Sequence, residues 1–326
     1  MSDARTGVPR PVSEGCDADR EGSATIRPSA PAVNGLAEGR VSRAACQALN
    51  DALQWRQDSG RPVRLWLRDD DAVQPGEALD RLLNMTQAQG IPLTLAVIPA
   101  FSGAALAQRL QPLPTVEVAV HGWAHMNHAA ATEKKQELGR QRPLEQTCAE
   151  LQRGLQHLQQ WHGAQCLPLL VPPWNRIAAS LIPRLSSIGF RAVSTFADIR
   201  FESMPMLNTH VDIIDWKGSR AKPQEERDGR RVAADEAAAR TQARSTRDAD
   251  ELFAELTARL LAGCDITGLL THHLVHEPPA WHFLEQLFEL TSRHPIVQWT
   301  AASHLLSAEF PDPGFPGQQQ ATVPGL

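Results

Sequence analysis

The chain has 326 residues, of which 42% are hydrophobic and 21% are charged, and its formal net charge is −5 at pH 7. This length exceeds that of a usual single domain, yet α/β barrels often occupy it as one unit, and the apolar content is enough for a large core. The acidic balance and the lack of a basic stripe argue against nucleic-acid binding, and the absence of Tyr excludes tyrosine chemistry.

The five cysteines are scattered along the chain without a CxxC pair, which argues against a disulfide framework and against a cysteine-based zinc site. The N-terminus lacks the apolar core of a signal peptide, and no hydrophobic run approaches the length of a membrane span. We therefore expect a cytoplasmic protein without a transmembrane segment.

Residues 1–40 are rich in Pro, Gly, Ser, Ala and charge without periodicity, which predicts a disordered N-terminal tail. From Val41 onward, helical and strand patterns alternate, beginning with a helix. Strands are expected at 63–67, 93–98, 116–120, 167–171, 191–195, 211–215, 266–271 and 296–299. Amphipathic helices are expected at 77–89, 145–161, 177–188, 250–262 and 280–292.

Strands that alternate with helices predict βαβ units and a mainly parallel α/β sheet. Seven or eight such units suggest closure into a barrel over residues 41–310. Residues from about 217 to 247 are charged and Ala-rich, which favours an exposed insertion, either a mobile helix or an ordinary long loop. Residues 311–326 are expected to form a flexible C-terminal tail.

Three consecutive carboxylates, Asp69, Asp70 and Asp71, follow the first predicted strand. They repel one another, so they require a cation or shared protons. For an isolated triplet, an acidic turn or a helix cap would be the simpler explanation, because Asp suits both. A second polar cluster, His121 and His125 in an HxxxH pattern, follows the third predicted strand and favours a metal site instead.

His121 and His125 would lie on one face if the segment after the strand turned helical, so both rings could reach one ion. Imidazole and carboxylate ligands suit zinc, with nickel, cobalt or iron as alternatives. Two histidines and one aspartate leave coordination positions open, which is typical of a catalytic site. His128 is expected to be a loop residue or a secondary partner.

Polar and aromatic residues also follow the ends of later predicted strands. These are Pro172, Pro173 and Trp174 after the fourth strand, Asp215 and Trp216 after the sixth, and His272 and His273 after the seventh. The carboxyl ends of the strands in a parallel barrel form one face, where catalytic groups gather. This convergence indicates an enzyme.

The order of these motifs resembles the polysaccharide deacetylases, the chitooligosaccharide-deacetylase-like proteins of carbohydrate esterase family four. The resemblance spans about residues 60–280 and involves five separated motifs. They are Arg68-Asp69-Asp70-Asp71-Ala72, His121-x-x-x-His125, Val171-Pro172-Pro173-Trp174, Asp212-Ile213-Ile214-Asp215-Trp216 and Leu269-Leu270-Thr271-His272. The family fold is a distorted (β/α) barrel, which agrees with the periodicity of the sequence.

The resemblance implies that Asp70 is the catalytic base and that Asp71, His121 and His125 bind the metal ion. A shift of the alignment by one residue would instead make Asp69 the base and Asp70 the metal ligand. The implied cofactor is one divalent metal ion, with zinc expected.

His272 is implied to be the general acid, with His273 as an alternative. The backbone N–H of Trp174 is implied to help hold the oxyanion, and the rings of Trp174 and Trp216 could stack on a sugar or belong to the core. Asp215 is expected to orient other groups rather than to react.

The sequence departs from the family pattern at several positions. Val171 stands where the third motif usually opens with an arginine that orients the catalytic aspartate, and Arg68 or Arg176 could replace that arginine. Gly122 replaces the usual hydroxyl residue after the first metal-binding histidine, and Met126 replaces the usual proline. These departures indicate a divergent subgroup.

The sequence thus predicts a metal-dependent hydrolase that removes an acetyl group from an N-acetylated sugar, releasing acetate. The sugar could be free, lipid-linked or nucleotide-linked, and the oligomeric state stays open. One alternative is another amidohydrolase, similar to the allantoinase-like relatives, and a second is a carbohydrate-binding protein with a decayed site. Both alternatives are disfavoured by the retained Asp-His-His set.

Overall fold

The computed structural model of the chain describes residues 40–216 and 245–309, all within the unit Ala37–Leu326. The predicted tail at 311–326, nearly all of the tail at 1–40 and most of the predicted insertion therefore lie outside the described residues. The domain boundaries expected from the sequence stay predictions. Within the described ranges, no helix is both long enough and apolar enough to cross a bilayer.

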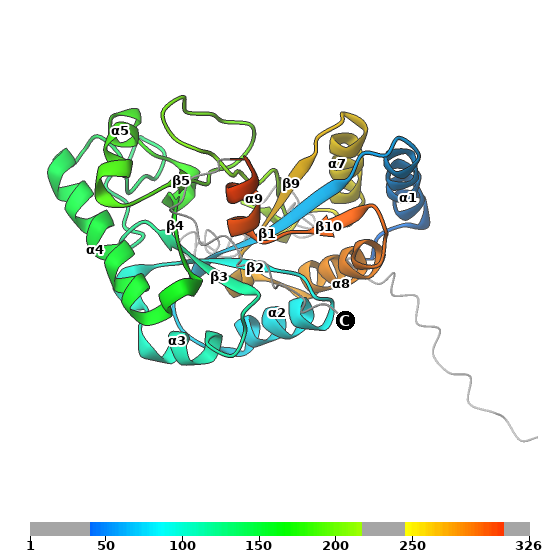
Figure 1. Cartoon of the computed structure of the whole chain (residues 1–326), viewed down its shortest axis with the longest axis horizontal. Helices are drawn as coiled ribbons and strands as arrows, with labels where there is room; N and C mark the ends of the chain where they lie inside the picture. Colours follow the sequence, from blue (N-terminus) through cyan, green and yellow to red (C-terminus); the bar gives the residue numbers. More distant parts are fainter. Residues whose placement is uncertain (1–39, 217–244, 310–326) are drawn as a thin grey trace, which may run out of the picture. The chain divides into compact units, whose positions relative to one another are not determined.

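The centre of the fold is a curled sheet of eight strands, in which every pairing is parallel (Figure 1). The strand order is β5-β4-β3-β2-β1-β9-β6, and β10 also pairs with β1. The strands are β1 (Val63–Ala72), β2 (Leu93–Val97), β3 (Val116–His121), β4 (Cys166–Val171), β5 (Ala192–Val193), β6 (Val211–Asp212), β9 (Ile266–Thr271) and β10 (Val297–Trp299). A separate antiparallel pair consists of β7 (Ile214–Asp215) and β8 (Ser245–Thr246).

The two edges of this sheet are joined through an irregular segment rather than through regular strands. Parallel bridges connect Val193 to Met206 and Phe196 to Thr209, and the Ala197 N–H donates to the Thr209 carbonyl at 2.8 Å. The sheet therefore closes only loosely on this side. The predicted distorted (β/α) barrel of seven or eight mainly parallel strands is confirmed.

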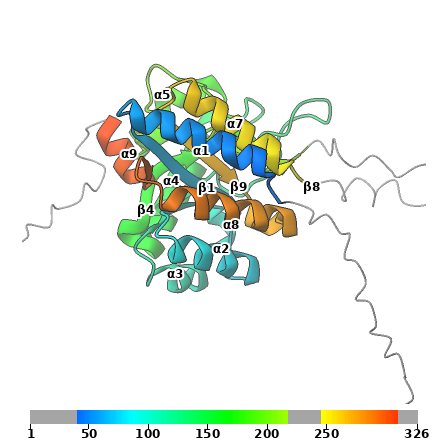
Figure 2. The same ribbon diagram turned by 90° about the vertical axis from the view of Figure 1, so that its right-hand side faces the viewer.

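Helices cover the outside of the sheet, except for α9 (Ala302–Glu309), which packs inside the barrel. The covering helices are α1 (Arg43–Asp58), α2 (Glu77–Ala88), α3 (Ala104–Leu110), α4 (Leu144–His162), α5 (Ile182–Leu185), α7 (Ala249–Leu261) and α8 (Pro278–Ser292). Figure 2 shows α1 lying alongside α7. The Asp248 side chain caps α7 by accepting hydrogen bonds from the backbone N–H groups of Asp250 and Glu251, which satisfies donors that the helix itself leaves free.

The predicted helix at 177–188 is wrong in form. The chain there makes two 3-10 turns, Ala179–Leu181 and Ser186–Ile188, around the single α-turn of α5. Pro183 has no N–H to donate, so it is tolerated in the first turn of a helix, as in α5, but not in the middle of the predicted one. The short helices α3 and α9 were not predicted, because seven or eight residues give too little periodicity to recognise.

Side chains of β1 alternate between the inside of the barrel and the helical layer. Trp66 packs inside with residues such as Ala96 and Leu169, whereas Leu65 and Leu67 belong to the larger core beneath the helices. The strand is longer than predicted and includes the aspartate triplet within its carboxyl end. The three carboxylates can continue the strand because each has a polar or charged partner: Thr271 for Asp69, Arg68 for Asp70 and His121 for Asp71.

Candidate active site

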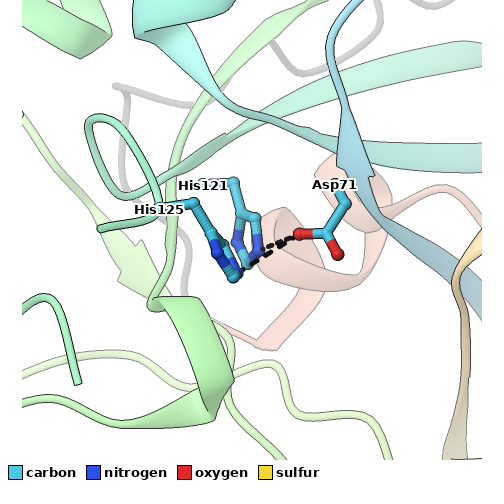
Figure 3. A group of neighbouring side chains, drawn as sticks. All are labelled: Asp71, His121 and His125. Carbon is cyan, nitrogen blue, oxygen red and sulfur yellow. Dashed lines mark hydrogen bonds and ion pairs between the residues drawn. The ribbon is translucent and has the colours of Figure 1, made fainter. Parts of the chain in front are cut away.

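Three side chains predicted as metal ligands meet at the carboxyl ends of the strands (Figure 3). Asp71 lies near the end of β1, His121 ends β3, and His125 follows in the next loop. Asp71 Oδ1 is 3.2 Å from His121 Nε2 and 3.3 Å from His125 Nε2, and the three candidate ligand atoms lie within 4.8 Å of one another. The fold thus brings one carboxylate and two imidazoles to one point.

The loop after β3 is not helical, so the expected helical turn is wrong although both imidazoles converge. Gly122 has φ of 62° and His125 has φ of 54°, and these left-handed residues fold the loop back on itself. Asp71 also has a positive φ, 73°, at an irregularity in the pairing of β1 with β2. Strained backbone of this kind is typical of functional sites.

The hydrogen bonding of His121 suits a metal ligand. Its Nδ1–H donates to the Val171 carbonyl at 3.0 Å, because a carbonyl can only accept, and this fixes the ring with Nε2 directed toward Asp71. A ligating histidine commonly has its second nitrogen fixed in this way. The donor set of one oxygen and two nitrogens therefore fits a divalent ion such as zinc.

Electrostatics at these residues follow from burial and proximity. Burial alone would raise the pKa of Asp71, but the hydrogen bond from His121 and the charge of His121 hold that pKa well below its usual range. The pKa of His125 is lowered, chiefly by burial and then by the charge of His121. His125 is therefore held in the neutral form that metal binding requires.

Asp70 lies next to this group and is paired with Arg68 from the same strand. Arg68 Nε is 2.9 Å from Asp70 Oδ1, and Arg68 Nη2 donates to Asp70 Oδ2 at 3.1 Å. The guanidinium also donates to Asn175 Oδ1 at 2.7 Å and to Ser194 Oγ at 2.6 Å. Both Arg68 and Asp70 are buried, so the pair is shielded from water.

Arg68 is the arginine that contacts the candidate base. Arg176, the other candidate for the arginine missing at Val171, donates instead to the Lys135 carbonyl at 2.9 Å. The signal for Arg68 is present in the sequence, because residues two apart in a strand lie on the same face. The hydrogen bonds from Arg68 to Asn175 and Ser194 could not be predicted, because these two residues follow other strands and approach Arg68 only in the folded chain.

Asp69 is on the opposite side of β1 and is fully occupied there. It accepts hydrogen bonds from Thr271 Oγ1 at 2.6 Å and from the His273 N–H at 2.8 Å, and it also contacts His273 Nδ1. Burial would raise the pKa of Asp69, but the charge and hydrogen bonds of His273 lower it. The geometry therefore favours the alignment in which Asp71, and not Asp70, adjoins the imidazoles, and it leaves His273 paired with Asp69.

His272 faces Asp70 from the end of β9. Its Nε2 is 3.9 Å from Asp70 Oδ2, and its ring lies edge-on to that of Trp216, with centroids 4.6 Å apart. Asp212, which was not predicted as a functional residue, is half-buried, and its carboxylate interacts electrostatically with His272 and accepts a hydrogen bond from Trp216 Nε1 at 2.8 Å. Burial raises the pKa of Asp212. Asp215 is buried and pairs with Ser245 in the small sheet.

Trp174 adjoins the second imidazole. Its ring centroid is 4.3 Å from that of His125, and both Trp174 and Asn175 have positive φ, 57° and 55°. A cavity of about 680 Å³ lies elsewhere, at the amino ends of the strands, where its lining includes Arg64 and Ile266. The described residues place their metal-ligating cluster at the opposite, carboxyl end of the barrel.

Comparisons with known proteins identify the fold. No family model and no curated protein matches the sequence. Among solved structures, a candidate polysaccharide deacetylase from Mycobacterium smegmatis aligns with a TM-score of 0.54 and 16% identity, over 76% of this chain and 90% of that one. The resemblance to the polysaccharide deacetylases is thereby confirmed as a likeness of fold.

Two further solved structures are similar at lower scores. A family 4 acetyl xylan esterase from Clostridium thermocellum, in complex with a cobalt ion, aligns with a TM-score of 0.46 and 15% identity, over 76% of this chain and 91% of that one. A peptidoglycan deacetylase from Bacillus subtilis aligns with a TM-score of 0.45 and 14% identity, over 76% and 92%.

Proposed function

We propose that this chain is a metal-dependent hydrolase that removes the acetyl group from an N-acetylated sugar and releases acetate. The observation that supports this most is the set of Asp71, His121 and His125 beside an Asp70 carboxylate held by Arg68. The fold supports it as well, because a structure of this fold is described as a candidate polysaccharide deacetylase.

Asp71, His121 and His125 would hold one divalent ion, for which the donor set favours zinc, with nickel, cobalt or iron as alternatives. Such an ion supplies Lewis-acid polarisation of a carbonyl and lowers the pKa of a water molecule. The chain's own residues then position the substrate and move the protons.

Asp70 is proposed to accept the proton of the attacking water. Arg68 contacts both carboxylate oxygens of Asp70 and so fixes the orientation of the group. Asn175 holds Arg68 in turn, which links the base to the loop that also carries Trp174. In this proposal the backbone N–H of Trp174 helps to hold the developing oxyanion.

His272 is proposed to donate a proton to the departing amine, since an amine anion is a very poor leaving group. The 3.9 Å between His272 Nε2 and Asp70 Oδ2 supports this pairing of acid and base. The rings of Trp174 and Trp216 would line the sugar site beside these groups.

The experiment is an acetate-release assay on acetamido sugars that are free, lipid-linked or nucleotide-linked. The protein is first stripped with a chelator and then reloaded with zinc or cobalt. We expect acetate from at least one substrate with the reloaded protein, none from the stripped protein, and about 10²- to 10⁴-fold slower release from an Asp70→Asn variant.

The two alternatives give other outcomes in the same assay. Hydrolysis of a cyclic ureide without any acetate release would move the assignment to an amidohydrolase of the allantoinase-like kind. Sugar binding without turnover by the fully loaded protein would indicate a decayed site. The cytoplasmic location stays a prediction that fractionation of expressing cells can test.

A further inference from the structure

The loop between the two candidate metal-binding histidines is fixed by groups outside it. Glu137, which is 1% exposed, accepts a hydrogen bond from the N–H of Ala124 at 2.8 Å and another from the N–H of Trp123 at 3.3 Å. The Trp123 carbonyl accepts from the N–H of Ala100 at 2.9 Å. The backbone of this non-helical loop is therefore satisfied by a distant carboxylate and by the loop after β2.

Glycines allow the close approach of Glu137 and of helix α4. A Cβ atom on Gly122 would lie 2.0 Å from Glu137 Oε2 and 2.7 Å from Pro173 Cγ, so no side chain fits at Gly122 while these two residues occupy their positions. A Cβ on Gly154 of α4 would lie 3.0 Å from Pro99 Cγ, next to Ala100, and the neighbouring Arg153 guanidinium stacks 3.9 Å from the Trp123 ring centre. The loop is thus held from two sides.

We propose that Glu137 is a positioning residue that sets the separation of the His121 and His125 imidazoles before a metal ion binds. His125 directly follows the two residues whose N–H groups Glu137 binds, and it has a left-handed φ of 54°. Two charge-assisted hydrogen bonds maintain this strained backbone. The inference rests on the proposed metal-binding function. It also accounts for Gly122 at the position where the polysaccharide deacetylases usually have a hydroxyl residue.

The test measures Zn²⁺ and Co²⁺ affinity of the full chain by competition with a chromophoric chelator. For Glu137→Ala we expect roughly 10- to 100-fold weaker binding, the usual cost of losing an outer-shell partner of a ligand. The d–d absorption bands of bound Co²⁺ should also change, because His125 would no longer be held in place. Glu137→Gln keeps one acceptor oxygen, so it should recover part of the affinity and part of the wild-type spectrum.

Glu133→Gln is the matched control, because Glu133 belongs to the same segment but is exposed and bonds only within it. Its Co²⁺ spectrum should equal that of the wild type. Unchanged affinity and spectrum in Glu137→Ala would overturn the positioning role while leaving the metal site intact. If that variant does not fold, Glu137→Gln decides by the same criterion. A wild-type protein that binds neither ion would overturn the proposed function, and the positioning role with it.

Discussion

Three consecutive aspartates have different surroundings in this fold, and their partners distinguish their roles. Asp69 bonds to His273, Asp70 pairs with Arg68, and Asp71 adjoins the imidazoles. Strand alternation separates Asp69 from Asp70, and the left-handed φ of Asp71 turns its carboxylate toward the candidate metal ligands. The sequence locates the triplet but does not decide which aspartate is the base and which the metal ligand. Both possible alignments with the family motif place an aspartate in each of these two roles.

Substitution of neighbouring aspartates should separate metal binding from turnover. Asp71→Asn is expected to bind zinc at least tenfold more weakly, because one of three ligands loses its charge. Asp70→Asn is expected to retain the ion and to lose acetate release by a factor of about 10² to 10⁴, the usual contribution of a general base. Elemental analysis and the acetate assay measure the two effects. The opposite pattern would transfer the ligand role to Asp70.

The two arginines considered for the missing position give a second contrast. Arg68→Lys should lower kcat by about 10- to 100-fold, because a lysine cannot bond to Asp70, Asn175 and Ser194 at once as the planar guanidinium does. Arg176→Lys should leave kcat unchanged, since Arg176 contacts the Lys135 carbonyl. Equal effects of the two substitutions would show that Arg68 does not orient the base.

At the scale of elements, the pattern of strands predicts where the site lies but not how its loops are shaped. Strand exits carry the functional residues, because parallel strands place their carboxyl ends together. The HxxxH spacing would place both rings on one face in a helical turn, yet the loop reaches the same convergence through left-handed residues and Glu137. Glu137 could not be recognised in the sequence, because no motif around it indicates that its carboxylate binds the backbone of the loop after β3.

The glycine of this loop should be more sensitive to substitution than a glycine with the same backbone elsewhere. Gly90 has φ of 65° and open space around it, so Gly90→Ala should cost only the backbone penalty of about 1–2 kcal/mol. Gly122→Ala adds the clash with Glu137 at 2.0 Å and should cost clearly more, together with lower zinc affinity. Chemical denaturation measures both free energies of unfolding. Equal losses would mean that the loop can move away from Glu137.

At the scale of the whole molecule, α9 packs into the barrel at one end and the candidate active site lies at the other. The α9 side chains Leu305 and Leu306 pack inside the barrel with Trp66. Glu117 accepts a hydrogen bond from the N–H of Ser303 at 3.3 Å, and its carboxylate at the start of α9 suits the helix dipole. Burial raises the pKa of Glu117. The parallel barrel was predictable from the alternating elements. The packing of α9 into the barrel was not, because eight residues near the end of the chain give too little periodicity to show where they pack.

The buried His162 should make the stability of the molecule depend on pH. Burial, and then the charge of His157, lowers the pKa of His162 to about 4, compared with about 6.5 in an unfolded chain. Between these values the unfolded state binds more protons, so the free energy of unfolding should rise with pH by up to about 1.4 kcal/mol per pH unit from this group.

Urea denaturation across that pH window provides the measurement, with His162→Leu as the comparison. The variant should show a smaller slope of the unfolding free energy against pH, because the titrating group is removed. An identical slope in both proteins would show that His162 does not carry this dependence.

Left-handed backbone is concentrated where the candidate active site lies. Of five non-glycine residues with positive φ in the described ranges, Asp71, His125, Trp174 and Asn175 belong to that site. Engineering for heat resistance would select glycine at each of these positions, since glycine adopts this conformation without a steric cost. Asn175→Gly, for example, would relax the chain but remove the acceptor of Arg68. Substitutions that raise conformational stability at these four residues are therefore expected to lower activity.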